Sequence, residues 1–301
     1  MKKLSLTLVL MICTLFLFAE KKPKPDAEVV DSTQIMYEAI EKNLNYQMGD
    51  IVVGDNLAKI KVPAGFRFLD AKQAEYVIYE VWGNLKGQND KLYGMIVPEN
   101  IGVTDANGWA FVVEYDDMGY VKDDDADKIN YDNLLKELQE GEKEENAERV
   151  KQGYSSIHMV GWAQKPYYDK NRKVLHWAKE IAFGTDTAHT LNYNIRVLGR
   201  KGVFVLIAVG VMKKLPEIYQ KIDWMLNSVE FNQGNKYSDF NPSVDKVAAW
   251  TIGGLVAGKV LAKAGLFAII LKFGKVIILG LAAVGGTIWK FITGKKGEEN
   301  A

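Results

Sequence analysis

Cysteine is almost absent from this chain of 301 residues. The single cysteine, Cys13, lies inside an apolar run at the N-terminus, and if that run is removed the mature protein has no thiol chemistry and no disulfide. A lipoprotein signal places a small residue directly before its cysteine, whereas Ile12 stands there in this chain and apolar residues continue to Phe18. We therefore do not expect the chain to be lipidated.

Motifs that carry known chemistries are also missing. The sequence contains no Gly-x-Ser-x-Gly, no His-Glu-x-x-His and no glycine-rich phosphate loop before a helix. Its three histidines, His158, His176 and His189, are not spaced as metal ligands are. We therefore expect no bound metal and no cofactor, and the sequence names no catalytic residue. Whether the protein is an enzyme stays open, and the sequence favours that it is not.

Net charge is lacking too, since 38 basic residues balance 38 acidic ones. The two signs are nevertheless separated along the chain. Residues 20–244 carry 35 acidic and 28 basic side chains, whereas residues 245–301 carry 3 acidic and 8 basic ones. Nucleic acids are bound by clustered lysine and arginine, so the acidic body argues against a nucleic-acid partner. The basic end is also strongly apolar, which indicates a membrane.

The N-terminus has the layout of a secretory signal. Two lysines precede about fifteen apolar residues, and an abruptly polar segment follows Ala19. We predict a signal peptide over residues 1–19 and a polar linker over residues 20–30. A retained anchor is the alternative, because Leu17 stands where a small residue is preferred before the cut. The apolar run is, however, shorter than the roughly twenty residues that span a bilayer.

Residues 236–301 are predicted to anchor the chain in a membrane and to end in a basic tail. The best span, 276–292, contains one charge, Lys290, which lies close enough to its end to reach the interface. Trp289 beside it is typical of an interfacial anchor.

Two topologies of this segment compete. A single pass leaves Lys290, Lys295 and Lys296 in the cytoplasm, as the positive-inside tendency prefers. The alternative is a hairpin that turns near Gly274, buries Lys259 within its first span and returns the tail to the outside. We expect the single pass, with the C-terminus in the cytoplasm.

Between these ends, residues 31–235 have the pattern of an α+β domain, an antiparallel meander sheet with flanking helices. Helical periodicity begins near Asp31, follows Asp70, covers residues 131–151 and follows Pro216. Alternating residues predict strands over 92–97, 109–115, 158–164, 173–183, 190–198 and 203–210, and a hairpin is predicted around residues 54–56. On the strand 190–198 we predict one core face and one wetter face; the core face carries Leu191, Tyr193, Ile195 and Val197, and the wetter face Asn192, Asn194 and Arg196.

Four aspartates stand within five residues in the stretch GYVKDDDADKINY. An EF-hand loop that began at Asp123 would need glycine where Lys128 stands and glutamate where Leu134 stands, so the calcium motif fails. We interpret the stretch as an exposed loop whose negative charge favours the start of the helix near Tyr131. A weak divalent-cation or partner contact through Asp123, Asp124 and Asp125 is the alternative.

Several phrases occur in a fixed order: VPAGFRFLDA, FVVEYDDMGYVKDDDA, HMVGWAQKPYYD, LNYNIRVLGRKGV and YSDFNPSVDKVAAW before the apolar tail. In this order they resemble the bacterial membrane-anchored family of domain of unknown function 2167. The resemblance covers nearly the whole chain after the signal and implies location and architecture, but no activity. Residues 203–231 are more weakly similar to the close of PsbP-like domains, which is an analogy of fold alone.

We therefore expect a membrane-tethered binding or assembly module of the bacterial envelope. Its body would be periplasmic and its anchor would lie in the inner membrane; its partners would be the lipid bilayer and either another envelope protein or a second copy. The alternative is an envelope enzyme that uses carboxylate and aromatic residues in a cleft of the sheet domain. One pocket that gathers the candidate contact residues would favour the enzyme; these are Glu114, Tyr120, Trp162, Tyr193 and Arg196.

Overall fold

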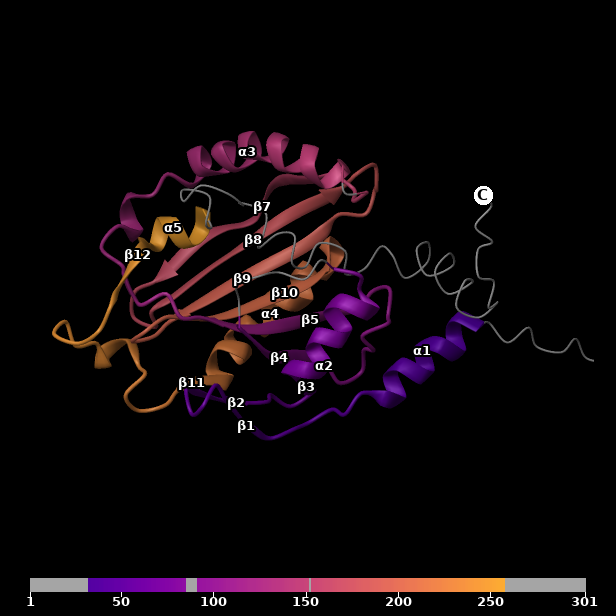
Figure 1. Ribbon diagram of the computed structural model, residues 1–301, viewed down its shortest axis with the longest axis horizontal. Helices are drawn as coiled ribbons and strands as arrows, with labels where there is room; N and C mark the ends of the chain where they lie inside the picture. The colour runs from indigo at the N-terminus through magenta and orange to yellow at the C-terminus, as the bar shows by residue number, and fades with distance from the viewer. Residues whose placement is uncertain (1–31, 85–90, 152, 258–301) are drawn as a thin grey trace, which may run out of the picture.

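A seven-stranded antiparallel sheet forms the centre of the molecule, with the order β3-β4-β5-β10-β9-β8-β7 (Figure 1). The computed structural model describes residues 32–84, 91–151 and 153–257. The predicted signal peptide and the predicted span 276–292, with Trp289 and Lys290, lie outside the described residues. The strands of the sheet are β3 (Phe66–Asp70), β4 (Lys91–Pro98), β5 (Trp109–Asp116), β7 (Ile157–Asp169), β8 (Val174–Phe183), β9 (Thr190–Leu198) and β10 (Val203–Val211).

The predicted meander is confirmed, because β7, β8, β9 and β10 are consecutive antiparallel neighbours. β10 then pairs with β5, which places the two most apolar strands in the middle of the sheet. Both faces of these strands are buried, as their unbroken apolar sequences require. The strand β3 was not predicted from the sequence.

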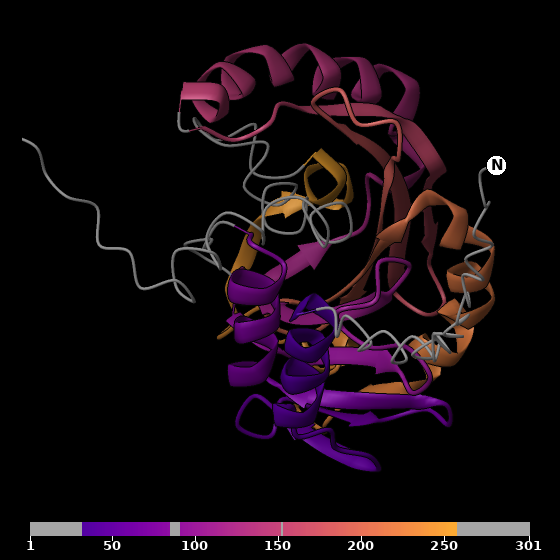
Figure 2. The same cartoon turned by 90° about the vertical axis from the view of Figure 1, so that its right-hand side faces the viewer.

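One face of the sheet, which we call the inner face, is covered by short helices. Figure 2 shows the sheet curving around α5 (Ile252–Ala257). α2 (Ala71–Glu75) and the π-helical turn η1 (Tyr76–Val81) cover the β3–β4–β5 end of the same face. The predicted helix after Asp70 is present, and Asp70 caps α2 by accepting a hydrogen bond from the Gln73 backbone N–H at 2.9 Å.

The opposite, outer face packs against α4 (Leu215–Ser228) and a small three-stranded sheet. Pro216 lies in the first turn of α4, where its missing N–H costs nothing. The small sheet has the order β1-β2-β11 and contains β1 (Asp50–Val53), β2 (Ala58–Lys61) and β11 (Val229–Phe231). The predicted hairpin around residues 54–56 is thus confirmed as the β1–β2 connection.

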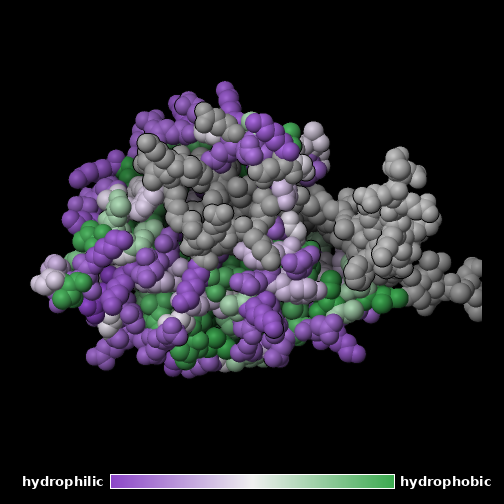
Figure 3. Space-filling view, viewed as in Figure 1, coloured by the Kyte–Doolittle hydropathy of each residue, from purple (hydrophilic) through white to green (hydrophobic). Residues whose placement is uncertain are grey.

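Two longer helices complete the layers. α1 (Ser32–Asn43) precedes β1, and α3 (Tyr131–Lys151) packs on β7 through Leu138, Ile157 and Met159. The outward side of α3 is hydrophilic (Figure 3), which fits its many charged residues. The predicted α+β class is confirmed as an antiparallel sheet with flanking helices.

The segment after Asn235 packs against this body instead of leaving it. η4 (Tyr237–Asp239) is followed by β12 (Val247–Thr251), which pairs in parallel with β6 (Tyr120–Lys122). α5 then buries Ile252, Leu255 and Val256 in the core of the inner face. Residues 236–257, which were predicted to belong to the membrane anchor, therefore pack as part of the domain. Among the described residues, no helix combines the length and the apolarity needed to cross a bilayer.

The expected division of β9 into a core face and a wetter face is correct on one side only. Leu191, Tyr193 and Ile195 lie in the core of the outer face. Asn192 and Asn194 on the other side are 2% and 1% exposed. Their face of the strand is therefore polar but shielded from solvent. The prediction failed there because alternation reports side-chain polarity, whereas burial depends on what packs over the sheet.

Candidate functional site

The aspartate stretch between β6 and α3 is the point where three distant parts of the chain meet. It contacts the turn between β7 and β8, the η4 turn and the junction of β12 with α5. We call this set of contacts the aspartate clamp and define it by its members: Asp123, Asp125, Tyr168, Lys173, Tyr237 and Thr251.

Asp123 lies at the centre of the clamp. Its Oδ2 accepts hydrogen bonds from the Tyr168 hydroxyl at 2.7 Å and from Lys173 Nζ at 2.8 Å. The Tyr237 hydroxyl lies 3.2 Å from Asp123 Oδ1 and 2.9 Å from the Val121 carbonyl oxygen. Burial alone would raise the pKa of the Asp123 carboxyl, but the hydrogen bonds from Lys173 and Tyr168 outweigh it and lower the pKa below its ordinary value. Asp123 is therefore held as a carboxylate.

Lys173 reaches Asp123 from a backbone conformation that glycine adopts more readily. Its φ is 56°, in the left-handed region, where the side chain of an L-residue is crowded. The ammonium also lies 5.0 Å from the centre of the Tyr237 ring. These contacts of the side chain offset the backbone strain of the turn.

Asp125 caps the start of α5 from a distant part of the sequence. Its carboxylate accepts hydrogen bonds from Thr251 Oγ1 at 2.5 Å and from the backbone N–H groups of Ile252 and Gly253 at 3.1 and 3.0 Å. The first N–H groups of a helix have no partner within the helix, and their positive end favours an anion. Asp125 therefore fixes where α5 begins and how it meets the sheet.

The other two aspartates are different. Asp124 is exposed and makes no hydrogen bond or ion pair with the described part of the chain. Asp127 forms an ion pair with Lys170 at the surface. The interpretation of the stretch as an exposed loop thus holds for Asp124 and Asp127. It is wrong for Asp123 and Asp125, because both carboxylates point into contacts with distant segments.

An aromatic stack adjoins the aspartate clamp at the start of β6 and shares Tyr237 with it. The Tyr120 ring lies 4.5 Å from that of Tyr237 and 3.8 Å from that of Phe240, centre to centre. Gly119 precedes the stack with φ at 99°, and a Cβ there would lie 2.7 Å from the Lys246 carbonyl oxygen. Only glycine therefore lets β12 approach β6 this closely.

A second attachment holds the same segment. Arg200, in the β9–β10 turn, donates to both carboxylate oxygens of Asp245, at 2.7 and 3.0 Å. The Asn241 N–H donates to Asp245 at 2.7 Å, and Arg200 also donates to the Gly234 carbonyl at 3.1 Å. Residues 234–253 are thereby fastened to the body at both ends.

The candidate contact residues are not gathered in one place. Glu114, Trp162 and Arg196 share the inner face, where the pairing places Val205 between Arg196 and Glu114. Tyr193 lies on the outer face, with its hydroxyl 2.9 Å from His176 Nδ1. Tyr120 lies in the aromatic stack. The arrangement that would have favoured an enzyme with all of these residues does not form.

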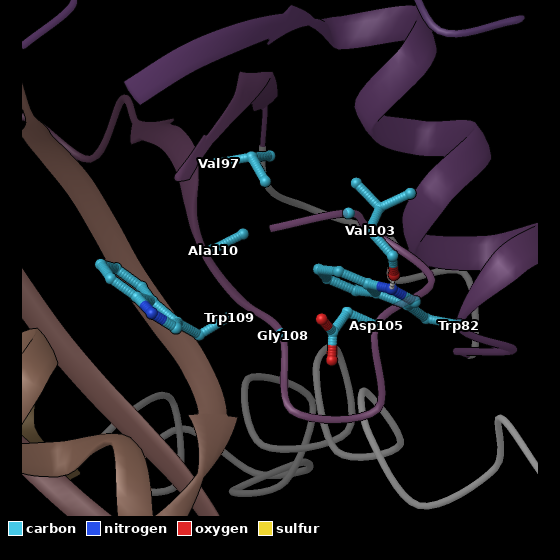
Figure 4. A pocket seen from close by; sticks show the side chains of 8 residues that line it. Trp82, Val97, Val103, Asp105, Gly108, Trp109 and Ala110 are labelled. Atoms are coloured by element: carbon cyan, nitrogen blue, oxygen red, sulfur yellow. Dashed lines mark hydrogen bonds between the residues drawn. The ribbon is translucent and has the colours of Figure 1, made fainter. Parts of the chain in front are cut away.

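A small cavity near α2 is equally unsuited to a substrate. It is lined by Trp82, Val103, Asp105 and their neighbours, and its volume of about 10 Å³ suits a single water molecule (Figure 4). Trp82 Nε1 donates to the Val103 carbonyl at 2.8 Å beside it. The parts of the chain that the structure describes contain no group of three or more His, Cys, Asp or Glu side chains arranged to hold a metal ion.

Sequence reasoning missed four members of the clamp, namely Tyr168, Lys173, Tyr237 and Thr251. A signal for two of them was present. Tyr168 lies within the phrase HMVGWAQKPYYD and Tyr237 begins YSDFNPSVDKVAAW, so both belong to the phrases that carry the family resemblance. Nothing local marks Thr251 or Lys173, because their partners stand about 126 and 50 positions away in the sequence.

Comparison with known proteins gives a family and several remote structural neighbours. The model of a family described as protein of unknown function (DUF2167) matches residues 45–285. No curated protein matches the chain.

The solution structure of cyanobacterial PsbP (CyanoP) from Synechocystis sp. PCC 6803 has 9% identity and a TM-score of 0.35, over 63% of this chain and 92% of that one. The Saccharomyces cerevisiae Ran-binding protein Mog1p has 12% identity and a TM-score of 0.32, over 66% and 100%. At these scores neither neighbour carries an argument about function.

Proposed function

The chain belongs to the family of proteins of unknown function DUF2167, a membership that assigns no activity, and from its geometry we propose a membrane-tethered binding or assembly module of the bacterial envelope. The observation that carries this proposal is the aspartate clamp. It fastens the sheet domain to residues 247–257, the stretch that leads directly into the long apolar segment of the sequence.

A clamp at this position has a physical purpose in a tethered protein. A domain joined to an anchor by a flexible linker takes all orientations, whereas a hydrogen-bonded junction fixes which surface faces the bilayer. Parallel strand pairing, a helix cap from Asp125 and the Arg200–Asp245 pair all act on the same twenty residues. Such a junction suits a module that presents one surface to a partner in the envelope.

The test is fractionation of bacteria that express the full chain. We expect the protein in the membrane fraction after an alkaline wash, and we expect protease added to spheroplasts to digest its body. A reporter fused after Ala301 tests on which side of the membrane the C-terminus lies. Fluorescence of a reporter that is active only in the cytoplasm supports a cytoplasmic tail. Recovery of the full chain in the soluble fraction, or a body protected from protease in intact spheroplasts, would contradict the tethering proposal.

The binding half of the proposal is tested separately. Crosslinking in intact membranes, followed by purification of the full chain, is expected to recover either a second envelope protein or a crosslinked dimer. The control variant replaces the three exposed lysines of α3, Lys136, Lys143 and Lys151, with Ala, which removes crosslinkable amines from this helix alone. Recovery of the bare monomer from all preparations would contradict a role in assembly.

A further inference from the structure

The inner face of the sheet carries a row of polar side chains that is buried and rich in hydrogen-bond donors. The row stands on β8 and β9, where Trp177 pairs with Asn194 and Lys179 pairs with Asn192. Arg196 continues it, with its guanidinium carbon 5.3 Å from the centre of a Trp177 ring. All these residues are at most 5% exposed. They are neighbours on one surface, because paired residues and residues two apart on a strand share a face.

The hydrogen bonds along β9 leave donors unused. Arg196 Nη2 donates to Asn194 Oδ1 at 3.2 Å, and Asn194 Nδ2 donates to Asn192 Oδ1 at 2.6 Å. The chain of bonds therefore ends on the Asn192 amide nitrogen, a donor. Trp177 Nε1 is buried without a hydrogen-bond partner, and the Lys179 ammonium makes no hydrogen bond or ion pair with the described residues. Buried polar groups rarely remain unpaired, so this set calls for an acceptor.

Positive charge accumulates at the same place. Burial and the neighbouring Arg196 lower the pKa of the Lys179 ammonium to about 8, so it remains mostly charged at neutral pH. The two carboxylates that β5 places on this face, Glu114 and Asp116, stand two strands away from β9. A buried ammonium without a close anion is expensive, and such groups gather at functional sites.

The chain that follows Ala257 carries an excess of the same sign of charge as Lys179 and Arg196. Residues 258–301 contain seven lysines and two glutamates. A segment with that excess of ammonium groups is repelled by Lys179 and Arg196, whereas an anion is attracted. Charge complementarity therefore favours a separate, negatively charged ligand.

We propose that the inner face is a binding site for an oxyanion, a carboxylate or phosphate group carried on an apolar body. The Lys179 ammonium, the Trp177 indole N–H and the Asn192 amide N–H hold its oxygens. Apolar side chains flank these donors on both sides, since Trp162 pairs with Lys179 across β7 and Val209 pairs with Asn192 across β10. Trp162 is itself fixed by a hydrogen bond from Nε1 to the Tyr131 carbonyl at 3.0 Å.

The Trp177 indole is the natural reporter of this site. In the ¹⁵N-labelled full chain, held in non-ionic detergent, its N–H resonance is identified by its loss in Trp177→Phe. It is then followed during titration with sodium phosphate, with sodium acetate and with phosphatidylglycerol, all at constant ionic strength. We expect at least one probe to shift it saturably. The Trp82 resonance serves as the internal control and is expected not to move, because its N–H is bonded to the Val103 carbonyl.

The three titrations distinguish the sources of the oxyanion. A response to phosphate or acetate assigns a freely diffusing ligand, and a response to phosphatidylglycerol alone assigns a lipid headgroup. Lys179→Met is expected to weaken the response roughly tenfold, the effect of losing one charge-assisted hydrogen bond. The control Lys213→Met removes an exposed lysine and is expected to leave it unchanged.

Two results would overturn the proposal: no saturable shift with any probe, or the same affinity in Lys179→Met as in the wild type. If Lys179→Met does not fold, as the Trp82 resonance reports, Asn192→Asp replaces it. That change sets a permanent carboxylate opposite Lys179 and is expected to abolish the response. A full response in Asn192→Asp would equally contradict the site.

Discussion

The aspartate clamp and the inner face both hold charged groups away from water, but they do so in opposite ways. In the clamp, each of the two central carboxylates meets at least two donors from distant segments. On the inner face, among the described residues, Trp177 Nε1 is buried with no hydrogen-bond acceptor. A satisfied cluster stabilises one arrangement of the chain, whereas an unsatisfied one costs stability. The first region therefore serves the structure, whereas the second is suited to a ligand.

The largest expected effect comes from removing the unpaired charge. Lys179→Met is expected to raise the free energy of unfolding at pH 7 by about 3 kcal/mol, since the pKa of the lysine lies roughly two units below its ordinary value. Chemical denaturation of the full chain in a buffer free of phosphate and carboxylates measures it. Lys213→Met, at an exposed position, is expected to change stability by less than about 0.5 kcal/mol. A Lys179→Met variant less stable than the wild type would show that the ammonium is already paired.

The same lysine predicts how stability depends on pH. Its pKa is about 8 in the folded state and about 10.4 in the unfolded state, so between these values the unfolded chain binds more protons. Stability therefore rises as the pH increases from 8 to 9.5, by roughly 2 kcal/mol. Lys179→Met is expected to lack this rise. A wild-type profile that is flat or falling over this window would contradict the burial of a charged Lys179.

The clamp predicts a loss of stability instead. Asp125→Ala removes the cap of α5 and is expected to lower the free energy of unfolding by about 1–2 kcal/mol. Asp124→Ala is the matched control, one position away and without described contacts, and is expected to have almost no effect. Equal effects of the two changes would instead support the interpretation of the whole stretch as an exposed loop.

The smallest expected effect is the loss of stability at low pH that results from protonation of Asp123. The pKa of Asp123 is lowered in the folded state, so its contribution is complete above about pH 5 and is lost as the pH falls through that lowered value. Water still reaches this carboxylate, so we expect no more than about 1 kcal/mol. The denaturant midpoint of Asp123→Asn is expected to fall less between pH 6 and pH 4 than that of the wild type. A wild-type protein more stable at pH 3 than at pH 6 would contradict this sign.

Much of the fold could be predicted from the sequence, because periodicity and turn residues are local. The meander β7 to β10, the hairpin at residues 54–56 and the helix over Tyr131–Lys151 follow from such patterns. The strands β3, β6 and β12 could not be predicted, since they are short and form only because they pair with distant strands. β12 forms because Gly119 leaves room for the Lys246 carbonyl, more than a hundred positions later.

The site was less predictable for the same reason. The aspartates were visible in the sequence, but their partners were not, and an acidic loop before a helix has a sufficient local explanation. On β9 the alternation of Asn192 and Asn194 was visible, but not that their face is buried. Burial and pairing depend on segments that meet in three dimensions, and a single sequence does not record those meetings.

The most direct test of the clamp is hydrogen exchange at the backbone amides of Ile252 and Gly253, whose N–H groups donate to Asp125. We expect both amides to be protected in the full chain, protection to be lost in Asp125→Ala, and protection to be kept in Asp124→Ala. Protection of these amides that is unchanged in Asp125→Ala would contradict the claim that this carboxylate fastens the C-terminal segment to the sheet.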